Sequence, residues 1–313
     1  MQKNLIAVCG PTASGKTALS IAIAKKYNGE VVSCDSMQIY KGMDIGTAKP
    51  TKKEMDNITH HMIDIIHPEE IYSVKNYKED AEKVIDDILS RKKLPVLAGG
   101  TGLYMDSVLN NVKFSESEYS SKERDRLYKI YEEKGKEYMH LMLERIDPLS
   151  AEKIHPNNIR RVIRALEIYY TTGKTMTQAN EYSVQDKKYN SLIIGLKWDR
   201  DVLYERINKR VDMMIEDGLL KEVTALKNAG IGKNTTSMQA IGYKEIYSYL
   251  DGEISLNEAV ELIKQESRRY AKRQMTWLNR NNDIKWIEIG KEDSLNEIFS
   301  ECMAEVEAMI NMI

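Results

Sequence analysis

The sequence is poor in the residues that form disulfide frameworks and metal centres. Its 313 residues include only five histidines and three cysteines, Cys9, Cys34 and Cys302. The cysteine spacing fits neither a disulfide framework nor a zinc site, so we expect small apolar side chains at these positions. The pair His60 and His61 is not accompanied by a second cluster of ligand residues at a spacing typical of a metal site. A transition-metal centre is therefore not expected.

Long apolar runs and a strong net charge are also absent. No segment reaches the roughly 18 apolar residues of a membrane-spanning helix, and the start MQKNLIAVCG lacks the features of an export signal. The net charge of −2 and the pI of about 6.3 disfavour indiscriminate binding to nucleic acid. We expect a cytoplasmic, monomeric protein with no membrane contact and no obligatory protein partner. A polyanionic partner would therefore have to bind at a local basic patch.

Short apolar runs separated by glycine turns predict an α/β fold. Residues 5–9 are typical of a buried parallel strand, residues 18–26 of a helix, and residues 31–34 of a second strand. This strand, helix and strand unit requires a parallel sheet. Residues 73–92 predict another helix with Ser73 as its cap, and the segment LPVLAGGTGLY predicts a strand followed by a glycine turn.

The composition changes in the middle of the chain. Charged, tyrosine-rich helical sequence extends from about 115 to 190, and apolar strands return with LIIGLKW and IKWIEI. We therefore predict a P-loop α/β core, with a parallel sheet flanked by helices, formed by residues 1–114 and 191–313. Residues 115–190 are predicted to form a helical insertion domain.

A phosphate-binding motif lies between the first strand and the first helix. Gly10, Gly15, Lys16 and Thr17 satisfy the pattern GxxxxGK[ST]. In such a loop the backbone N–H groups and the helix N-terminus face the phosphates, the lysine bridges phosphate oxygens, and the hydroxyl ligates Mg²⁺. Thr17 is thus the predicted Mg²⁺ ligand. The predicted diphosphate- or nucleotide-binding residues are Gly10, Pro11, Thr12, Ala13, Ser14, Gly15, Lys16 and Thr17.

The motif alone leaves the ligand open. A nucleotide triphosphatase also needs an acid at the end of a neighbouring strand; Asp35 fits that place, and Asp64 fits it less well. An ATP-binding small-molecule kinase therefore remains an alternative. A second alternative is a nucleic-acid-binding protein whose loop only senses a nucleotide.

Five segments in a fixed order narrow the choice among these functions. GPTASGKT, DSMQIYKGMDIGTAKP, GGTGLY, NNIRRVIRALEI and AKRQMTWL span nearly the whole chain and resemble the bacterial tRNA dimethylallyltransferase family. The resemblance implies transfer of a dimethylallyl group from dimethylallyl diphosphate to N6 of adenosine 37 in tRNAs that read codons beginning with U. It also implies that the insertion contacts tRNA. In TWLNR, Asn279 precedes Arg280 where the family often has arginine first.

The implied reaction assigns roles to three side chains. The amine of adenine is a poor nucleophile, so a base must accept a proton as the new bond forms. Asp35 matches the family's catalytic aspartate, with metal ligation or helix capping as the alternative. Thr101 matches a threonine that hydrogen-bonds at the reacting centre, and its alternative is also a helix cap. Arg210 is similar to the arginine that reaches the diphosphate; Arg206, four residues earlier, is the substitute.

Basic stretches offer local contacts for tRNA. Residues 264–280 contain several cations and one acid, Glu266, so like charges repel across helix turns unless a polyanion lies there. The target adenine must be turned out of its stack, and the Gln38 amide can both donate to its edge and accept from it. By resemblance, the tRNA-binding residues are Asp35, Ser36, Met37, Gln38, Ile159, Arg160, Arg161, Val162, Ile163, Gln239, Gly242, Lys244, Lys272, Arg273 and Gln274.

Overall fold

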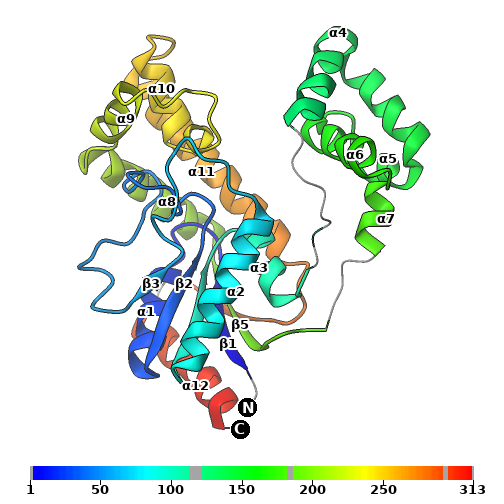
Figure 1. Cartoon of the computed structure of the whole chain (residues 1–313). Helices are drawn as coiled ribbons and strands as arrows, with labels where there is room; N and C mark the ends of the chain where they lie inside the picture. Colours follow the sequence, from blue (N-terminus) through cyan, green and yellow to red (C-terminus); the bar gives the residue numbers. More distant parts are fainter. Residues whose placement is uncertain (1–2, 113, 115–120, 182–185, 292–294, 312–313) are drawn as a thin grey trace. The chain divides into compact units, whose positions relative to one another are not determined.

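The chain forms two compact units in the computed structural model, which describes residues 3–112, 114, 121–181, 186–291 and 295–311 (Figure 1). The first unit joins Met1–Leu109 to Lys187–Ile313, and the second is Asn110–Asp186. The chain thus leaves the first unit after residue 109 and returns to it at residue 187.

A six-stranded sheet forms the centre of the first unit. All strand pairs are parallel, and the spatial order is β3-β2-β4-β1-β5-β6. The strands are β1 (Asn4–Cys9), β2 (Gly29–Cys34), β3 (His60–His61), β4 (Leu94–Gly99), β5 (Asn190–Trp198) and β6 (Ile284–Ile289). The predicted parallel α/β fold is confirmed. The edge strand β3 was not predicted, because two residues carry no periodic pattern.

Helices cover both faces of this sheet (Figure 1). Alternate residues of β1 enter two different cores, as a strand buried on both sides requires. One core contains side chains of α2 (Val74–Ser90) and α3 (Gly102–Leu109), and the other contains side chains of α1 (Lys16–Lys26) and α12 (Leu295–Asn311). The sheet is therefore held rigid from both sides.

The start of α2 shows why this segment is helical. The Ser73 side chain accepts a hydrogen bond from the Asn76 N–H, and the Asn76 side chain in turn accepts from the Ser73 N–H. The predicted cap is thus confirmed. Tyr77 on the inner face of α2 is fully buried, donates to the Ser33 carbonyl at 2.9 Å and stacks on Tyr104 with ring centroids 4.0 Å apart.

Four further helices and a 3₁₀ turn complete the first unit. They are α8 (Arg200–Glu216), α9 (Leu219–Asn228), η1 (Ser237–Gln239), α10 (Tyr243–Leu250) and α11 (Leu256–Leu278). Their apolar faces form a separate core, which also takes up Ile39, Tyr40 and Met43 from the loop that follows β2. That loop is consequently packed against helices far away in the sequence.

The second unit is helical. It consists of α4 (Ser121–Ile146), α5 (Pro148–Lys153), α6 (Ile159–Thr172) and α7 (Met176–Glu181), around a core that includes Leu127, Met139 and Leu166. Gly135, with φ 77°, interrupts α4. In the described part of the chain, no helix has the length and apolarity needed to cross a membrane.

We predict that shortening Ile85 destabilises the first unit. Ile85 lies on the inner face of α2 and is fully buried, whereas Ile71, which precedes the helix, is 65% exposed. Ile85→Ala should lower the free energy of unfolding by about 2 to 5 kcal/mol, and the control Ile71→Ala should change it by less than about 0.5 kcal/mol. Urea unfolding followed by circular dichroism measures both. Equal effects would show that the inner face of α2 is wrongly assigned.

Candidate active site at the carboxyl ends of the strands

Three parallel strands end side by side at one edge of the sheet. In the register of β1, β4 and β2, Cys9 pairs with Gly99, and Gly99 pairs with Cys34. The residues that follow these strands, among them Gly10 and Asp35, therefore leave the sheet at the same level. Open parallel sheets bind their ligands at this edge.

The loop after β1 has the shape of a phosphate cradle. Gly10 and Gly15 have φ values of 149° and 96°, which favour glycine, and a Cβ on Gly10 would lie 2.9 Å from the Leu196 carbonyl oxygen. Helix α1 begins at Lys16, so its first N–H groups face the loop. The Ser14 hydroxyl is buried and has no hydrogen-bond partner among the described residues. A phosphate oxygen would satisfy it.

Two cations lie beside this loop. Lys16 Nζ donates to the Pro11 carbonyl at 2.6 Å. The pKa of Lys16 is lowered to about 8, mainly by burial and then by the Arg210 cation, while the Asp35 carboxylate acts in the opposite direction. Burial also lowers the pKa of Arg210. A bound polyanion would offset the free-energy cost of burying these two cations and would reduce the repulsion between them.

Arg206 and Arg210 have different surroundings. Arg206 Nε donates to the Ala13 carbonyl at 2.9 Å, and its guanidinium lies 4.2 Å from the Trp198 ring centroid. Trp198 itself donates to the Ser14 carbonyl at 2.9 Å. Arg206 thus braces the phosphate loop and lines one of the cavities around it, whereas Arg210 lines that cavity and the two cavities that Asp35 also lines. This geometry favours Arg210 as the diphosphate contact.

Gln274 connects α11 to two of the strand ends. Its Oε1 accepts from the Thr12 N–H at 2.9 Å, and its Nε2 donates to the Gly100 carbonyl at 2.9 Å. The side chain is only 7% exposed. We predicted a tRNA contact here, but both ends of the amide are already used inside the protein, so Gln274 instead holds the phosphate loop against the turn after β4.

Asp35 shapes the loop that follows β2. Its Oδ1 accepts from the N–H groups of Met37 and Gln38, at 2.9 and 3.4 Å. Asp35 also lines one cavity together with Lys16 and Arg210, and a second cavity together with Arg210. One oxygen therefore fixes the local backbone, and the group as a whole lies beside the phosphate cradle.

Thr101 joins the turn after β4 to the same loop. Its Oγ1 accepts from the Ser36 N–H at 3.1 Å and donates to the Ser36 hydroxyl at 3.4 Å. The Thr101 carbonyl, and not its side chain, receives the first N–H groups of α3 from Tyr104 and Met105. The side chain thus faces the loop after β2 and does not cap the helix that it precedes.

The amide of Gln38 is used within its own loop. Its Oε1 accepts from the Ser33 hydroxyl at 3.1 Å, and its Nε2 donates to the Thr47 and Ala48 carbonyls, each at 3.3 Å. We expected this amide to face the adenine. In the structure it holds the two arms of the loop together.

An apolar cavity of about 310 Å³ lies next to Asp35. Its walls combine polar groups with apolar side chains, a composition typical of small-molecule sites. The apolar part is formed by Met37, Ala48, Ile207, Val211, Met214, Ala240, Ile241 and Ile263. Polar atoms come from Thr12, Asp35, Arg210, Lys244, Tyr270 and Arg273, among others. The cavity can hold an apolar group and a flat polar ring close to both a carboxylate and an anion site.

The other predicted tRNA-binding residues of the first unit differ in their exposure. Lys272 and Arg273 are exposed on α11, and Gln239 is exposed in η1. Lys244 lines the apolar cavity. Gly242 is buried, with φ 97°, and its N–H donates to Glu245 at 2.8 Å, so it shapes the start of α10.

Repulsion within the basic stretch of α11 is smaller than the sequence implied. Lys264 pairs with Asp212 of α8 at 2.8 Å and with Glu261 at 3.2 Å. Arg269 pairs with Glu266 at 2.6 Å. The fold brings in acids from outside the stretch, so like charges alone no longer argue for a polyanion there.

The predicted tRNA residues of the second unit lie at the start of α6. Arg160 and Arg161 are exposed. Ile159 is partly buried, while Val162 and Ile163 are fully buried in the core of that unit. The side chains of Val162 and Ile163 therefore support the helix and are not presented to a partner.

Two features of the site escaped the sequence reasoning. Tyr270 of α11 lines the same cavities as Asp35; burial raises its pKa, and a hydrogen bond with Thr101 opposes this. Thr47 and Ala48 also form cavity walls. Both lie in or beside segments that carry the family resemblance, but nothing in their residue types indicates that they face a ligand.

The residues fit a Mg²⁺ ion that arrives with a diphosphate. Among the described residues, no group of three His, Cys, Asp or Glu side chains could hold a metal ion. The Thr17 side chain is exposed at the start of α1. Mg²⁺ keeps several waters and binds through phosphate oxygens with few protein ligands. Thr17 and a diphosphate would provide that environment.

Comparison with known proteins identifies the family. Residues 38–281 match the family model described as IPP transferase. A tRNA dimethylallyltransferase of Acetivibrio thermocellus is 52% identical over 94% of this chain and 95% of its own length, and one from Oceanobacillus iheyensis is 51% identical over 91% of both chains. The chain belongs to the IPP transferase family. The predicted family is thus confirmed.

Solved structures of IPP transferases share the fold. The full-length tRNA isopentenylpyrophosphate transferase of Bacillus halodurans superposes with a TM-score of 0.74 and 44% identity over 99% of both chains. A eukaryotic dimethylallyltransferase acting on tRNA gives a TM-score of 0.83 at 32% identity, over 96% of this chain and 78% of its own.

We predict that Gly100 and Gln274 act as one unit. A Cβ on Gly100 would lie 2.1 Å from Gln274 Nε2, so Gly100→Ala should displace the amide and free the Thr12 N–H. Gly100→Ala and Gln274→Ala should each weaken binding of inorganic diphosphate, and the double variant should be little worse than either. Isothermal titration of the three variants measures this coupling. Additive losses would mean that Gln274 does not support the phosphate loop.

Proposed function

We propose that this IPP transferase moves a dimethylallyl group from dimethylallyl diphosphate to N6 of adenosine 37 in tRNAs that read codons beginning with U. The products are N6-(dimethylallyl)adenosine and diphosphate. The observation that carries the proposal is the placement of Asp35 beside the phosphate cradle and the apolar cavity. The reaction needs a base, an anion site and an apolar pocket at one point.

Asp35 is the base in this reaction. The adenine N6 lone pair is delocalised into the ring, so attack on carbon requires removal of a proton. As N6 bonds to the first carbon of the dimethylallyl group, the proton passes to the Asp35 carboxylate. The carbon–oxygen bond breaks at the same carbon, and its electron pair leaves with the diphosphate. Met37 and Gln38 keep the carboxylate oriented through their N–H groups.

The phosphate loop stabilises the leaving group. Negative charge grows on the diphosphate as the bond to carbon breaks, so the donors around the loop bind the transition state more strongly than the ground state. These donors are the N–H groups at the start of α1, Lys16 and Arg210. Mg²⁺, held by Thr17 and the diphosphate, would neutralise further charge.

Contacts to tRNA come from both units in this proposal. Lys272, Arg273 and Gln239 provide exposed polar groups on the first unit, and Arg160 and Arg161 provide them on the second. The insertion, residues 115–190, would thus serve as a tRNA-contacting domain. We further propose that the enzyme acts as a monomer in the cytoplasm, because a protein that carries both the transfer site and its own RNA contacts needs no second subunit.

The kinase alternative is not favoured. The similar proteins are named for dimethylallyl transfer to tRNA, and the Asp64 carboxylate, the weaker candidate for a nucleotide-site acid, is paired with Lys49 at 2.5 Å. A kinase would release ADP from ATP without tRNA. Incubation with labelled dimethylallyl diphosphate and unmodified tRNA, followed by digestion to nucleosides, distinguishes the two reactions.

We predict that Asp35→Asn abolishes most transfer while tRNA binding is preserved. The asparagine oxygen can still accept from the Met37 and Gln38 N–H groups, so the loop keeps its shape, but the base is lost. The rate should fall by about 10² to 10⁴-fold. Single-turnover transfer and filter binding of an anticodon stem-loop measure the two properties. A near-normal rate in this variant would remove Asp35 from its role.

We also predict a specific effect of Thr17 on the metal requirement. Thr17→Val removes the hydroxyl at the start of α1 and should raise the Mg²⁺ concentration needed for half-maximal transfer, whereas Thr17→Ser should leave it nearly unchanged. Titration of Mg²⁺ at saturating tRNA gives this value. An identical Mg²⁺ dependence in all three proteins would show that Thr17 is not a ligand.

A further inference from the structure

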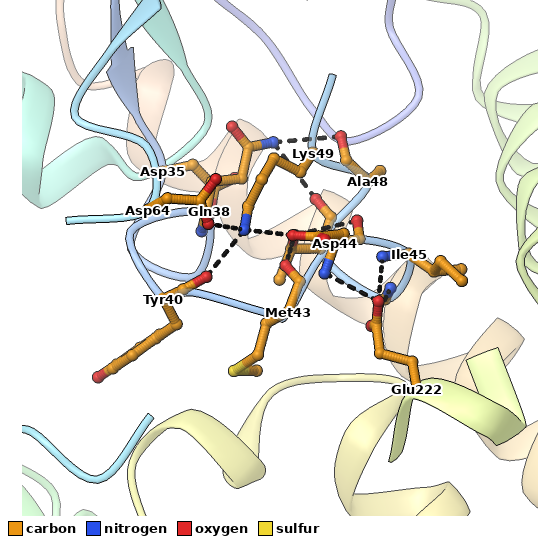
Figure 2. A network of polar contacts seen from close by, with 12 residues as sticks. Asp35, Gln38, Tyr40, Met43, Asp44, Ile45, Ala48, Lys49, Asp64 and Glu222 are labelled. Atoms are coloured by element: carbon orange, nitrogen blue, oxygen red, sulfur yellow. Dashed lines mark hydrogen bonds and ion pairs between the residues drawn. The ribbon is translucent and has the colours of Figure 1, made fainter. Parts of the chain in front are cut away.

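The loop from Ser36 to Pro50, here called the β2 loop, is attached to a carboxylate from a distant helix. Three consecutive backbone N–H groups of this loop, those of Asp44, Ile45 and Gly46, donate to Glu222 of α9 at 3.0, 2.8 and 3.2 Å. Figure 2 shows the carboxylate of Glu222 next to this turn. Successive N–H groups that converge in this way form an anion-binding concavity, and an internal carboxylate fills it.

Glu222 is itself held in place. The Tyr243 hydroxyl of α10 donates to Glu222 Oε1 at 2.5 Å. The Tyr243 ring lies directly against the loop, because a Cβ on Gly46 would come within 2.4 Å of it. Both helices are anchored in the core that contains Tyr243, Leu219 and Val223. The loop therefore rests on a rigid support with no room to shift toward it.

The other side of the β2 loop is fixed by a buried ammonium. Lys49, 5% exposed in its side chain, donates to the Tyr40 carbonyl at 2.8 Å, to Asp44 at 2.6 Å and to Asp64 at 2.5 Å (Figure 2). A buried cation with several acceptors in fixed positions resists rearrangement, since any shift leaves charge unpaired. Asp44 is thus held at its backbone by Glu222 and at its side chain by Lys49.

A continuous series of hydrogen bonds connects this support to the reacting region. The Thr47 hydroxyl donates to the Met43 carbonyl at 2.6 Å. The Gln38 amide binds the Thr47 and Ala48 carbonyls, and the Gln38 N–H donates to Asp35. Ala48 lines all three cavities around the phosphate loop. A displacement of Asp44–Gly46 would move both a wall of the site and the backbone next to Asp35.

We infer that Glu222 is a positioning residue for dimethylallyl transfer: by filling the N–H concavity of the β2 loop, it sets the cavity wall that Thr47 and Ala48 form beside the phosphate loop and Asp35. This inference rests on the proposed function. Glu222 touches neither the phosphate loop nor the exposed basic residues of α11, so its loss should alter the rate of transfer and spare the binding of both substrates. A misplacement of reacting groups by about 1 Å can cost roughly 100-fold in rate.

Glu222→Ala tests this role in the full-length protein. We expect kcat, normalised to the fraction of protein that binds an anticodon stem-loop, to fall by roughly 10 to 100-fold, with unchanged affinity for that RNA and for inorganic diphosphate. Amide hydrogen exchange of peptides covering residues 44–46 should become faster, while exchange of the phosphate loop stays the same. Glu222→Gln, whose amide oxygen still accepts from the loop, should recover part of the rate.

Glu258→Ala is the matched control. Glu258 also accepts a backbone N–H, from Ser255 at 2.8 Å, but at the start of α11 and outside the cavities. It should keep the wild-type kcat. If Glu222→Ala does not fold, Tyr243→Phe, which removes only the hydroxyl bond, should still lower kcat severalfold and speed exchange at residues 44–46.

The outcomes separate the two claims. If the wild-type protein forms no prenylated adenosine, the proposed function fails. If the wild type is active and Glu222→Ala transfers at the same rate, or if Glu258→Ala loses as much activity as Glu222→Ala, only the positioning role of Glu222 is refuted. A lower kcat without faster exchange at residues 44–46 would also refute it, because the loop would then be unchanged.

Discussion

The constraint on which this structure depends is the common level at which β1, β4 and β2 end. Parallel pairing sets Cys9, Gly99 and Cys34 in one row, so three successive loops begin at the same edge of the sheet. One loop has the shape of a phosphate cradle, one carries the Asp35 carboxylate, and one carries Thr101. Elements separated by up to 90 residues meet at this edge because the backbone ladder brings them together.

The loops need external supports, since a sheet edge fixes only where they start. Gln274 joins the phosphate loop to the turn after β4, Arg206 and Trp198 hold its outer side, and Glu222 holds the loop after β2. All of these come from the C-terminal part of the chain, which returns to the sheet after the insertion. The apolar core shared by α8, α9, α10 and α11 makes these supports rigid. In the proposed reaction the N-terminal part therefore provides Asp35 and the phosphate loop, and the C-terminal part supplies Arg210 and the side chains that position these loops.

Local signals in the sequence were sufficient for the sheet, the phosphate loop and the placement of Asp35, because each depends on neighbouring residues. The supports could not be predicted in this way. Gln274 was assigned to RNA because it lies among exposed cations, and only the fold shows that its amide faces inward. Val162 and Ile163 were included with exposed neighbours although helical periodicity buries them. Strand β3 is too short to give a pattern, and the acids that neutralise α11 come partly from α8.

Two of the residues that end the central strands are cysteines, and their burial has a chemical consequence. An allylic diphosphate is a carbon electrophile, and a thiolate would attack it more readily than an aromatic amine does. Burial raises the pKa of Cys9 to about 12 and raises that of Cys34 as well, so both sulfurs stay protonated and enclosed. In the proposed reaction, this burial keeps two potential competitors within one residue of the phosphate loop and of Asp35 without exposing them to alkylation by the allylic donor.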